Sequence, residues 1–219
     1  MLPRRYQLLK TVLDKRQPDL TVMMENVHKS HNLSAILRTC DAVGVLEAHA
    51  VSQRGEVKTY NKTAQGSQKW VELQVHESTD GATAHLHSQG FQVYAAHLSE
   101  QAVDYREIDF TQPSAVLLGA EKWGVSDRAA ELCDRHIIVP MVGMVESLNV
   151  SVASAVILFE AQRQRLAAGM YDQPRIPAVD YQRILFEWAY PELARRYRKK
   201  QEAYPALDEA GQLLSRGSL

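Results

Sequence analysis

The sequence lacks the features of a membrane or secreted protein. No apolar run approaches the roughly 18 residues that a membrane-spanning helix requires, and residues 1–6 carry none of the apolar core of a signal peptide. Only two of the 219 residues are cysteines, Cys40 and Cys133. Both lie in apolar stretches of helical pattern, which favours free thiols over a disulfide. These absences predict a cytoplasmic protein that does not interact with membranes.

The common nucleotide and metal motifs are missing as well. The sequence contains no G-x-x-x-x-G-K-[ST] phosphate loop and no G-x-G-x-x-G after a strand. His85 and His87 are the only close histidine pair, and two residues apart on a predicted helix they point in different directions. With no third ligand nearby in the sequence, we expect no metal site. No serine or cysteine is marked as a nucleophile, although this leaves nucleophilic catalysis open.

An excess of charge of one sign is also absent. The formal net charge of −1 gives no general attraction to nucleic acid. Basic residues nevertheless gather near both ends of the chain, where they could contact RNA phosphates. The alternative is that they form ordinary solvated helix faces. The two clusters are Arg4, Arg5, Lys10, Lys15 and Arg16 near the start, and Arg195, Arg196, Arg198, Lys199 and Lys200 near the end.

Strand and helix patterns alternate along most of the chain. Helical periodicity and short apolar runs, many of them rich in β-branched residues, define the elements. Their alternation is typical of an α/β fold with a mostly parallel sheet flanked by helices. At 45% hydrophobic residues, the chain can form a full core. Predicted strands are 20–24, 46–51, 71–75, 91–96, 114–118 and 136–140, and predicted helices are 4–16, 33–43, 79–88, 126–133 and 149–167.

The pattern changes after the long helix. Pro174 and Pro177 predict a linker, and a second amphipathic helix begins near Tyr181. This C-terminal piece cannot bury its apolar face alone, so we expect it to pack back on the domain or on a partner. We therefore predict an N-terminal helical extension (1–19), a central α/β domain (20–168) and a C-terminal helical extension (169–219).

The most informative stretch joins a buried strand to a long buried helix at residues 137–154. Its β-branched run ends at Pro140, because proline removes a backbone donor. Ser147 and Asn149 are two possible N-caps for the helix that follows. A strand, a turn and a capped helix gather free backbone N–H groups, so this corner is a predicted small-molecule site.

A second stretch, residues 117–125, places a carboxylate at the end of a strand. The buried strand runs into Gly119, where the backbone can turn sharply, and Gly124 follows five residues later. Glu121 is thereby presented at the carboxyl end of a strand, where ligands bind in open α/β sheets. The alternative is a solvated loop carboxylate paired with Lys122.

A third stretch, the predicted helix 33–43, presents an arginine opposite its apolar face. At about 100° per residue, Arg38 lies away from the buried stripe and beside small residues such as Ser34 and Ala35. An arginine in such surroundings can be approached closely by a phosphate or ribose. The alternative is an exposed arginine paired with Asp41. Asn32 lies six residues earlier and could reach the same space from the N-cap.

These three stretches together resemble the SPOUT-class RNA ribose 2′-O-methyltransferases of the SpoU/TrmH family, and most closely the branch that methylates guanosine 18 of tRNA. The first motif of the family corresponds to Asn32 and Arg38 in 32–38, the second to Gly119, Glu121 and Gly124, and the third to 138–153. The resemblance covers about residues 20–168, and the flanking helices extend it. Each motif is short, but three in the same order are specific.

The resemblance implies properties that no residue pattern could have shown. It implies a trefoil knot near the C-terminal end of the domain, S-adenosyl-L-methionine bound in that knot, and a homodimer whose active site uses both subunits. Ala96 stands where many members carry a polar residue, so only its backbone is available there. The implied cofactor contacts are Ala96, Leu98, Gly119, Glu121, Gly124, Val139, Met141, Ser147, Leu148 and Asn149.

The implied reaction is methyl transfer from a sulfonium to a ribose 2′-hydroxyl of guanosine 18 in the tRNA D-loop. The resemblance associates Arg38 with activation of that hydroxyl, but a guanidinium is effectively always protonated. We therefore assign Arg38 as a clamp that stabilises the forming alkoxide. We expect Asn32 and Asn149 to orient Arg38 and the ribose while Glu121 holds its loop. Candidate RNA contacts are His31, Arg163 and Arg165, together with Arg4, Arg5, Arg16, Arg195 and Arg196.

Two alternative functions remain at this point. One is the same reaction on ribosomal RNA or at another tRNA position; the other is a non-catalytic RNA-binding protein on a SPOUT scaffold. The helices at both ends of the chain favour tRNA, because a bulky tRNA requires contacts beyond the active site. The presence of Arg38, Glu121 and Asn149 favours an enzyme.

Overall fold

The computed structural model describes residues 1–52 and 69–214. Within them the chain forms two compact units. One unit contains residues 17–170, and the other contains residues 1–16 together with 171–219. The larger unit contains the strands of the sheet and the helices around them, and the smaller unit is mainly helical.

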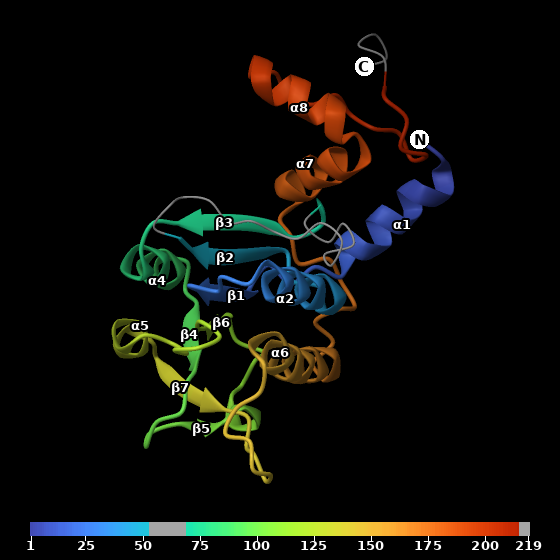
Figure 1. Cartoon of the computed structure of the whole chain (residues 1–219). Coiled ribbons are helices and arrows are strands. Elements are labelled where there is room, and N and C mark those ends of the chain that lie inside the picture. The colour runs from blue at the N-terminus through green and yellow to red at the C-terminus, as the bar shows by residue number, and fades with distance from the viewer. Residues whose placement is uncertain (53–68, 215–219) are drawn as a thin grey trace. The chain divides into compact units, whose positions relative to one another are not determined.

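The larger unit is built on a sheet of seven described strands in the order β3-β2-β1-β6-β4-β7-β5 (Figure 1). All six pairings between neighbouring strands are parallel, which confirms the predicted mostly parallel sheet. The strands are β1 (Leu20–Glu25), β2 (Glu47–Val51), β3 (Glu72–His76), β4 (Gln92–Ala96), β5 (Val103–Asp104), β6 (Ser114–Leu118) and β7 (Arg135–Ile138).

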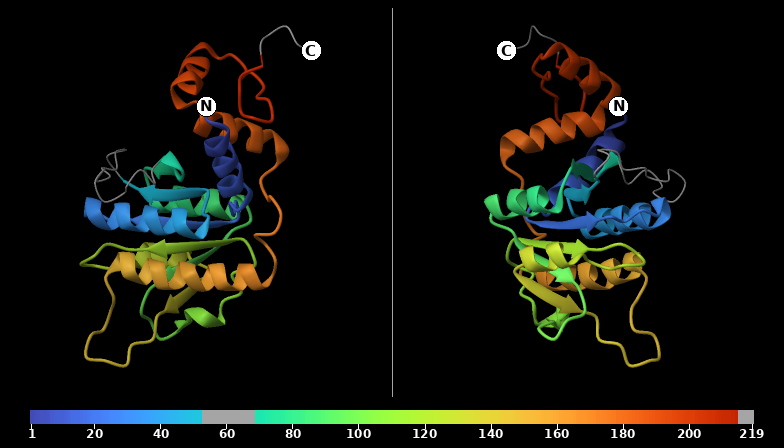
Figure 2. Two further views of the ribbon diagram at one scale, coloured as in Figure 1. Left: turned by 90° about the vertical axis from the view of Figure 1, so that its right-hand side faces the viewer. Right: turned by 60° about the vertical axis from the view of Figure 1, so that its left-hand side comes forward.

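Helices cover both faces of this sheet (Figures 1 and 2). Apolar residues of α2 and α6 share one core cluster with β1 and β6, whereas α4 and α5 pack on the opposite face. Because β1 and β6 are buried on both faces, their sequences are nearly continuous apolar runs. The helices are α2 (Ser30–Val43), α4 (Thr79–Ser88), α5 (Asp127–Leu132) and α6 (Val150–Ala167), and a 3₁₀ turn, η2 (Tyr105–Glu107), follows β5.

The ends of α2 and α6 can be compared with the caps expected from the sequence. Gly44 ends α2 in the left-handed conformation at φ 86°. Asn149 caps α6, since its side chain accepts a hydrogen bond from the backbone N–H of Ser151. However, α2 begins at Ser30 rather than at Leu33. Asn32 is therefore a buried residue of the first turn and not an N-cap, which corrects the expectation from sequence.

The smaller unit contains α1 (Pro3–Asp14), α7 (Ala178–Ala189) and α8 (Pro191–Lys200). Its N- and C-terminal segments pack together: the Tyr181 hydroxyl donates to Asp14 at 2.6 Å, and Phe186 stacks on Tyr204 with ring centroids 4.5 Å apart. Helix α7 thus packs against α1 and α8. In residues 1–52 and 69–214, no helix is long and apolar enough to span a membrane.

Candidate functional site

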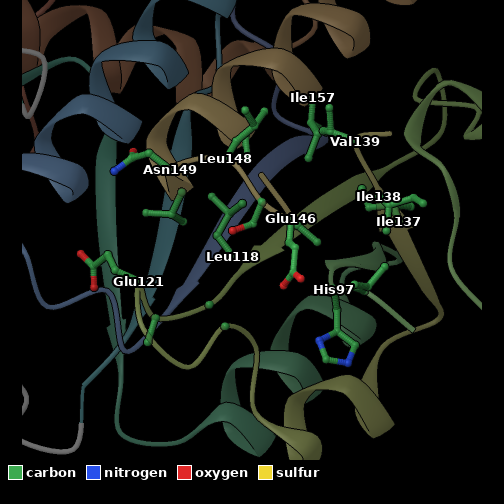
Figure 3. A pocket seen from close by; sticks show the side chains of 18 of the residues that line it. His97, Leu118, Glu121, Ile137, Ile138, Val139, Glu146, Leu148, Asn149 and Ile157 are labelled. Atoms are coloured by element: carbon green, nitrogen blue, oxygen red, sulfur yellow. The ribbon is translucent and has the colours of Figure 1, made fainter. Parts of the chain in front are cut away.

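A pocket of about 800 Å³ lies where β4, β6 and β7 end. Three connections line it: residues 96–98 after β4, residues 119–124 after β6, and parts of 139–150 between β7 and α6 (Figure 3). The apolar side chains of Leu118 and Ile157 form part of its wall. The structure brings all ten residues expected at the cofactor to this one pocket: Ala96, Leu98, Gly119, Glu121, Gly124, Val139, Met141, Ser147, Leu148 and Asn149.

The loop after β6 requires glycine at two positions. Ala120 and Gly124 exchange backbone hydrogen bonds of 2.9 and 2.8 Å, which closes the loop tightly. A Cβ atom at Gly119 would lie 2.1 Å from the carbonyl carbon of Gly124, so no side chain fits there. Gly124 has φ +68°, which other residues adopt only with strain. Both glycines are therefore needed for the loop to close on itself beside the pocket.

Glu121 ties this loop to the start of α2. Its Oε1 accepts hydrogen bonds from Asn32 Nδ2 at 2.8 Å and from the backbone N–H of Lys29 at 3.1 Å. Burial alone would raise the pKa of Glu121, but these hydrogen bonds outweigh it and lower the pKa. Glu121 therefore stays ionised as an acceptor. The Lys122 ammonium instead lies over the Trp123 ring, 4.4 Å from its centroid.

Asn32 joins two of the pocket residues. While its amide nitrogen donates to Glu121, its Oδ1 accepts from Asn149 Nδ2 at 3.3 Å. Asn149 also caps α6 through its own Oδ1. Three of the four residues assigned to catalysis, Asn32, Glu121 and Asn149, are thus connected by hydrogen bonds, and a change in any one alters the support of the other two.

Arg38, the fourth residue, is placed apart from these three. It lies on the exposed face of α2, opposite the buried stripe as predicted, and is not among the described residues that line the pocket. Six residues of helix separate it from Asn32, which is about 9 Å along the axis. Within one copy of the chain, Arg38 therefore faces solvent and is accessible to a large substrate.

The candidate RNA contacts divide into exposed and buried residues. His31, Arg4, Arg5, Arg163, Arg195 and Arg196 are exposed. Two of them form ion pairs, Arg163 with Glu160 at 2.8 Å and Arg195 with Glu192 at 2.9 Å. Exposed ion pairs of this kind are weak and can be exchanged for a phosphate.

Arg16 and Arg165 do not meet the expectation of RNA contact, because both side chains are fully buried. The Arg165 guanidinium donates to Asp19 Oδ1 at 2.5 Å and to the backbone carbonyl of Phe110 at 2.8 Å. The guanidinium lies where β1 and β6 begin, and it donates hydrogen bonds to oxygen atoms at that end of the sheet. Arg16 lies over the Trp188 ring, 5.2 Å from its centroid. Both arginines are therefore structural, and the prediction for them is wrong.

Five further charged or aromatic residues line the pocket and are not among the ten expected at the cofactor: Lys29, His97, Lys122, Trp123 and Glu146. Lys122 and Trp123 lie within the second motif stretch, so their position next to Glu121 was the available signal. Lys29 immediately precedes α2, and its backbone N–H is the group that contacts Glu121. Glu146 lies in the connection between β7 and α6, and its side chain is among those around the pocket (Figure 3), a position that residue patterns do not reveal.

Most of the chain matches the models of one protein family. Residues 19–159 match the model of the SpoU rRNA Methylase family, and residues 163–216 match the C-terminal SpoU rRNA methylase model. The tRNA (guanosine(18)-2'-O)-methyltransferase of Thermus thermophilus is 62% identical over 184 residues, covering 84% of this chain and 95% of that protein.

Two solved structures are similar to the chain. The TrmH/SpoU tRNA modifying enzyme of A. aeolicus has a TM-score of 0.82 at 43% identity, covering 87% of this chain and 97% of that one. The AdoMet-bound rRNA methyltransferase of Sinorhizobium meliloti has a TM-score of 0.60 at 28% identity, covering 68% and 58% of the two chains. The similarity to the A. aeolicus structure extends over nearly its whole length.

Proposed function

Since the chain belongs to the SpoU methylase family, we propose that it transfers the methyl group of S-adenosyl-L-methionine to the ribose 2′-hydroxyl of guanosine 18 in tRNA. The observation that carries this function is the convergence of the motif residues on one pocket in a chain 62% identical to a tRNA (guanosine(18)-2'-O)-methyltransferase. The high coverage of that relative favours tRNA over ribosomal RNA as the substrate.

The pocket fits S-adenosyl-L-methionine in size and chemistry. Its volume of about 800 Å³ lies within the usual range of small-molecule sites. Apolar side chains such as Leu118 and Ile157 can pack against an adenine, and peptide groups of residues 119–124, which also line the pocket, can bind its polar edge. When bound, this cofactor supplies an electrophilic methyl group on a sulfonium.

The reaction breaks the bond between sulfur and methyl carbon and forms one between that carbon and the 2′-oxygen. The hydroxyl proton must pass to an acceptor, and a phosphate of the substrate is one available group. Arg38 stabilises the negative charge on the 2′-oxygen through its fixed positive charge, and its planar fork fits an oxyanion or phosphate. Asn32 and Asn149 hold the elements around it, and Glu121 keeps its loop closed.

Arg38 does not line the pocket of its own chain. We infer a homodimer in which Arg38 of one copy faces a substrate bound at the pocket of the other. An exposed apolar surface supports this inference: Val142 and Met144 are fully exposed between β7 and α6, and Phe159 on α6 is 50% exposed. Association would remove this surface from water. The same connection between β7 and α6 is the segment we assign to the family's trefoil knot.

We assign the two terminal extensions, 1–19 and 169–219, to tRNA binding, and the central domain, 20–168, to methyl transfer. We place the activity in the cytoplasm, where a buried thiol such as that of Cys40 stays reduced.

The direct test is transfer of labelled methyl from S-adenosyl-L-methionine to unmodified tRNA transcripts. We expect the wild-type chain to label a transcript with guanosine 18 and not a matched transcript with adenosine at that position. Equal labelling of both transcripts would move the target elsewhere in tRNA. Labelling of ribosomal RNA but not of tRNA would establish the alternative substrate, and labelling of neither would leave a binding protein.

Gly119→Ala should weaken cofactor binding on the order of 100-fold, because the added Cβ would overlap Gly124 and displace the loop by about 1 Å. Isothermal titration with S-adenosyl-L-methionine measures the change. Gly143→Ala is the matched control, since a Cβ there has open space and the residue lies outside the pocket lining. An unchanged affinity in Gly119→Ala would remove the loop from the cofactor site.

Arg195→Ala/Arg196→Ala should flatten the salt dependence of tRNA binding. Each phosphate contact contributes about 0.9 to the slope of log affinity against log salt, so the slope should change by about 1 to 2. Cofactor affinity should stay the same. Arg128→Ala is the control, because this exposed arginine on α5 pairs with Asp80 and Glu131 and is not assigned to RNA. A slope equal to that of wild type would exclude both residues of α8.

A further inference from the structure

Three histidines outside the pocket lie close together on the face of the sheet that α4 covers. His85 of α4 lies beside His49 of β2, with ring centroids 5.7 Å apart, and beside His76 of β3, at 5.4 Å. No third ligand lies near the pair His85 and His87 in the sequence, but the fold brings residues of β2 and β3 to His85. His87 points elsewhere and contacts Asp134 at 3.0 Å.

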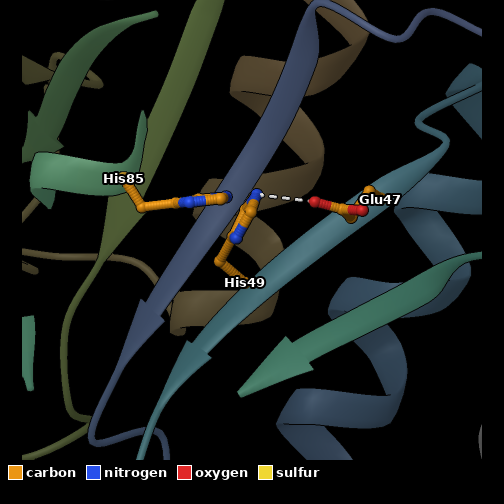
Figure 4. A group of neighbouring side chains, drawn as sticks. All are labelled: Glu47, His49 and His85. Carbon is orange, nitrogen blue, oxygen red and sulfur yellow. Dashed lines mark ion pairs between the residues drawn. The ribbon is translucent and has the colours of Figure 1, made fainter. Parts of the chain in front are cut away.

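The cluster has the donor set of a metal site. Ligand atoms of Glu47, His49 and His85 all lie within 4.8 Å of one another, and Figure 4 shows His49 between the other two. Glu47 Oε1 and His49 Nε2 are 3.4 Å apart. This is about the separation of two ligands on a tetrahedral ion with bonds of 2.0–2.1 Å. A shift of roughly 1 Å in the half-buried His85 side chain would close the third side.

We propose that Glu47, His49 and His85 bind a Zn²⁺ ion, with water as the fourth ligand. Two imidazole nitrogens and a carboxylate are a donor set that Zn²⁺ prefers, whereas Mg²⁺ and Ca²⁺ prefer oxygen ligands alone. None of the three residues lines the pocket after β4, β6 and β7. The ion therefore serves the fold by joining β2 to α4, and takes no part in methyl transfer.

His76 orients the central ligand. His76 Nε2 lies 3.0 Å from His49 Nδ1, on the ring edge away from Glu47. With the His49 proton on Nδ1, this hydrogen bond leaves the Nε2 lone pair directed at the metal, as second-layer partners of zinc-bound histidines do. His49 is only 2% exposed, so its ring is held in place by the side chains packed around it.

The test is Zn²⁺ binding by the full-length protein without a histidine tag, measured by competition with a chelating dye after removal of bound metals. Wild type should bind one equivalent per chain, and His85→Asn should weaken binding at least tenfold. His76→Gln should weaken it by about tenfold through loss of orientation. His87→Asn is the matched control: it removes a histidine from the same helix but not from the cluster, and should leave the affinity unchanged.

Thermal unfolding supplies a second readout that does not depend on the dye. Zn²⁺ at about 100 times its dissociation constant should raise the melting temperature of wild type by on the order of 5 °C, and that of His85→Asn by much less. Melting in the presence of a chelator shows whether each variant is folded. Less than one equivalent bound by wild type, or equal binding by His85→Asn and wild type, would overturn the proposal. So would equal losses in His85→Asn and His87→Asn.

Discussion

Arg38→Ala is expected to lower the rate of methyl transfer by 100- to 1,000-fold, on the order of 3 to 4 kcal/mol of transition-state stabilisation. The loss should appear in the rate constant and not in cofactor affinity, because Arg38 does not line the cofactor pocket of its own chain. Single-turnover transfer to a tRNA transcript measures the first quantity, and titration with S-adenosyl-L-methionine measures the second. Since Arg38 is exposed on α2, the variant should fold normally.

Two further variants distinguish the role of the positive charge of Arg38 from the role of its planar guanidinium geometry. Arg38→Lys keeps the positive charge but loses the planar bidentate geometry, so we expect activity well below wild type. Full activity in Arg38→Lys would contradict the clamp, while leaving an electrostatic role. Arg106→Ala is the control for removal of an exposed arginine, since Arg106 of η2 pairs with Asp104 of β5 and has no assigned role in the reaction. Wild-type activity in Arg38→Ala would remove Arg38 from the reaction.

A mixture containing two inactive variants gives a sharper test of the proposed dimer. If Arg38 acts on a pocket of the other copy, a heterodimer of Arg38→Ala and Gly119→Ala contains one pocket with an intact loop and an arginine facing it. Mixing and reassociating the two variants should then restore activity at up to one site in each heterodimer. If both residues act within one copy, no mixture regains activity.

The sheet could be predicted from sequence because its strands are short apolar runs separated by polar turns or helices. The residues of β6 agree with the prediction at both ends. Strand β5 was missed since it has only two residues, Val103 and Asp104, too few to produce an alternating pattern. The early start of α2 was missed because Ser30 and His31 are polar, and the burial of Asn32 depends on a partner in the loop at Glu121.

Residue patterns predicted a ligand site at the strand ends, and the family motifs supplied its full set of residues, whereas the roles of buried charges could not be predicted from the sequence. Helical periodicity identifies which residues share a face, but it does not reveal what that face meets. Arg165 lies at the end of α6, where a solvated cation would be favourable, and the sequence gives no sign that Asp19 lies opposite. His49 and His85 are likewise 36 positions apart, and only the crossing of α4 over β2 brings them together.

Arg165→Ala should destabilise the larger unit by about 3 to 5 kcal/mol, the usual cost of removing one partner of a buried ion pair. The guanidinium is fully buried and donates to Asp19 Oδ1, to the Asp19 carbonyl at 3.0 Å and to the Gln112 carbonyl at 3.1 Å. Its removal leaves these acceptors without their donor beside a cavity the size of the lost side chain. Urea unfolding followed by circular dichroism measures the loss in free energy of unfolding.

Arg163→Ala is the matched control, two residues earlier on the same helix. The Arg163 side chain is 67% exposed, and Glu160, although mostly buried, keeps a second donor in Gln164, so the variant should change stability by less than about 1 kcal/mol. The two arginines should also differ in the opposite sense in tRNA binding: only Arg163→Ala can alter the salt slope, because only Arg163 is accessible to a phosphate. A stability loss in Arg165→Ala no larger than that of Arg163→Ala would show that the end of the sheet does not depend on this cation. The network around Asp19 would then be a consequence of the fold rather than one of its supports.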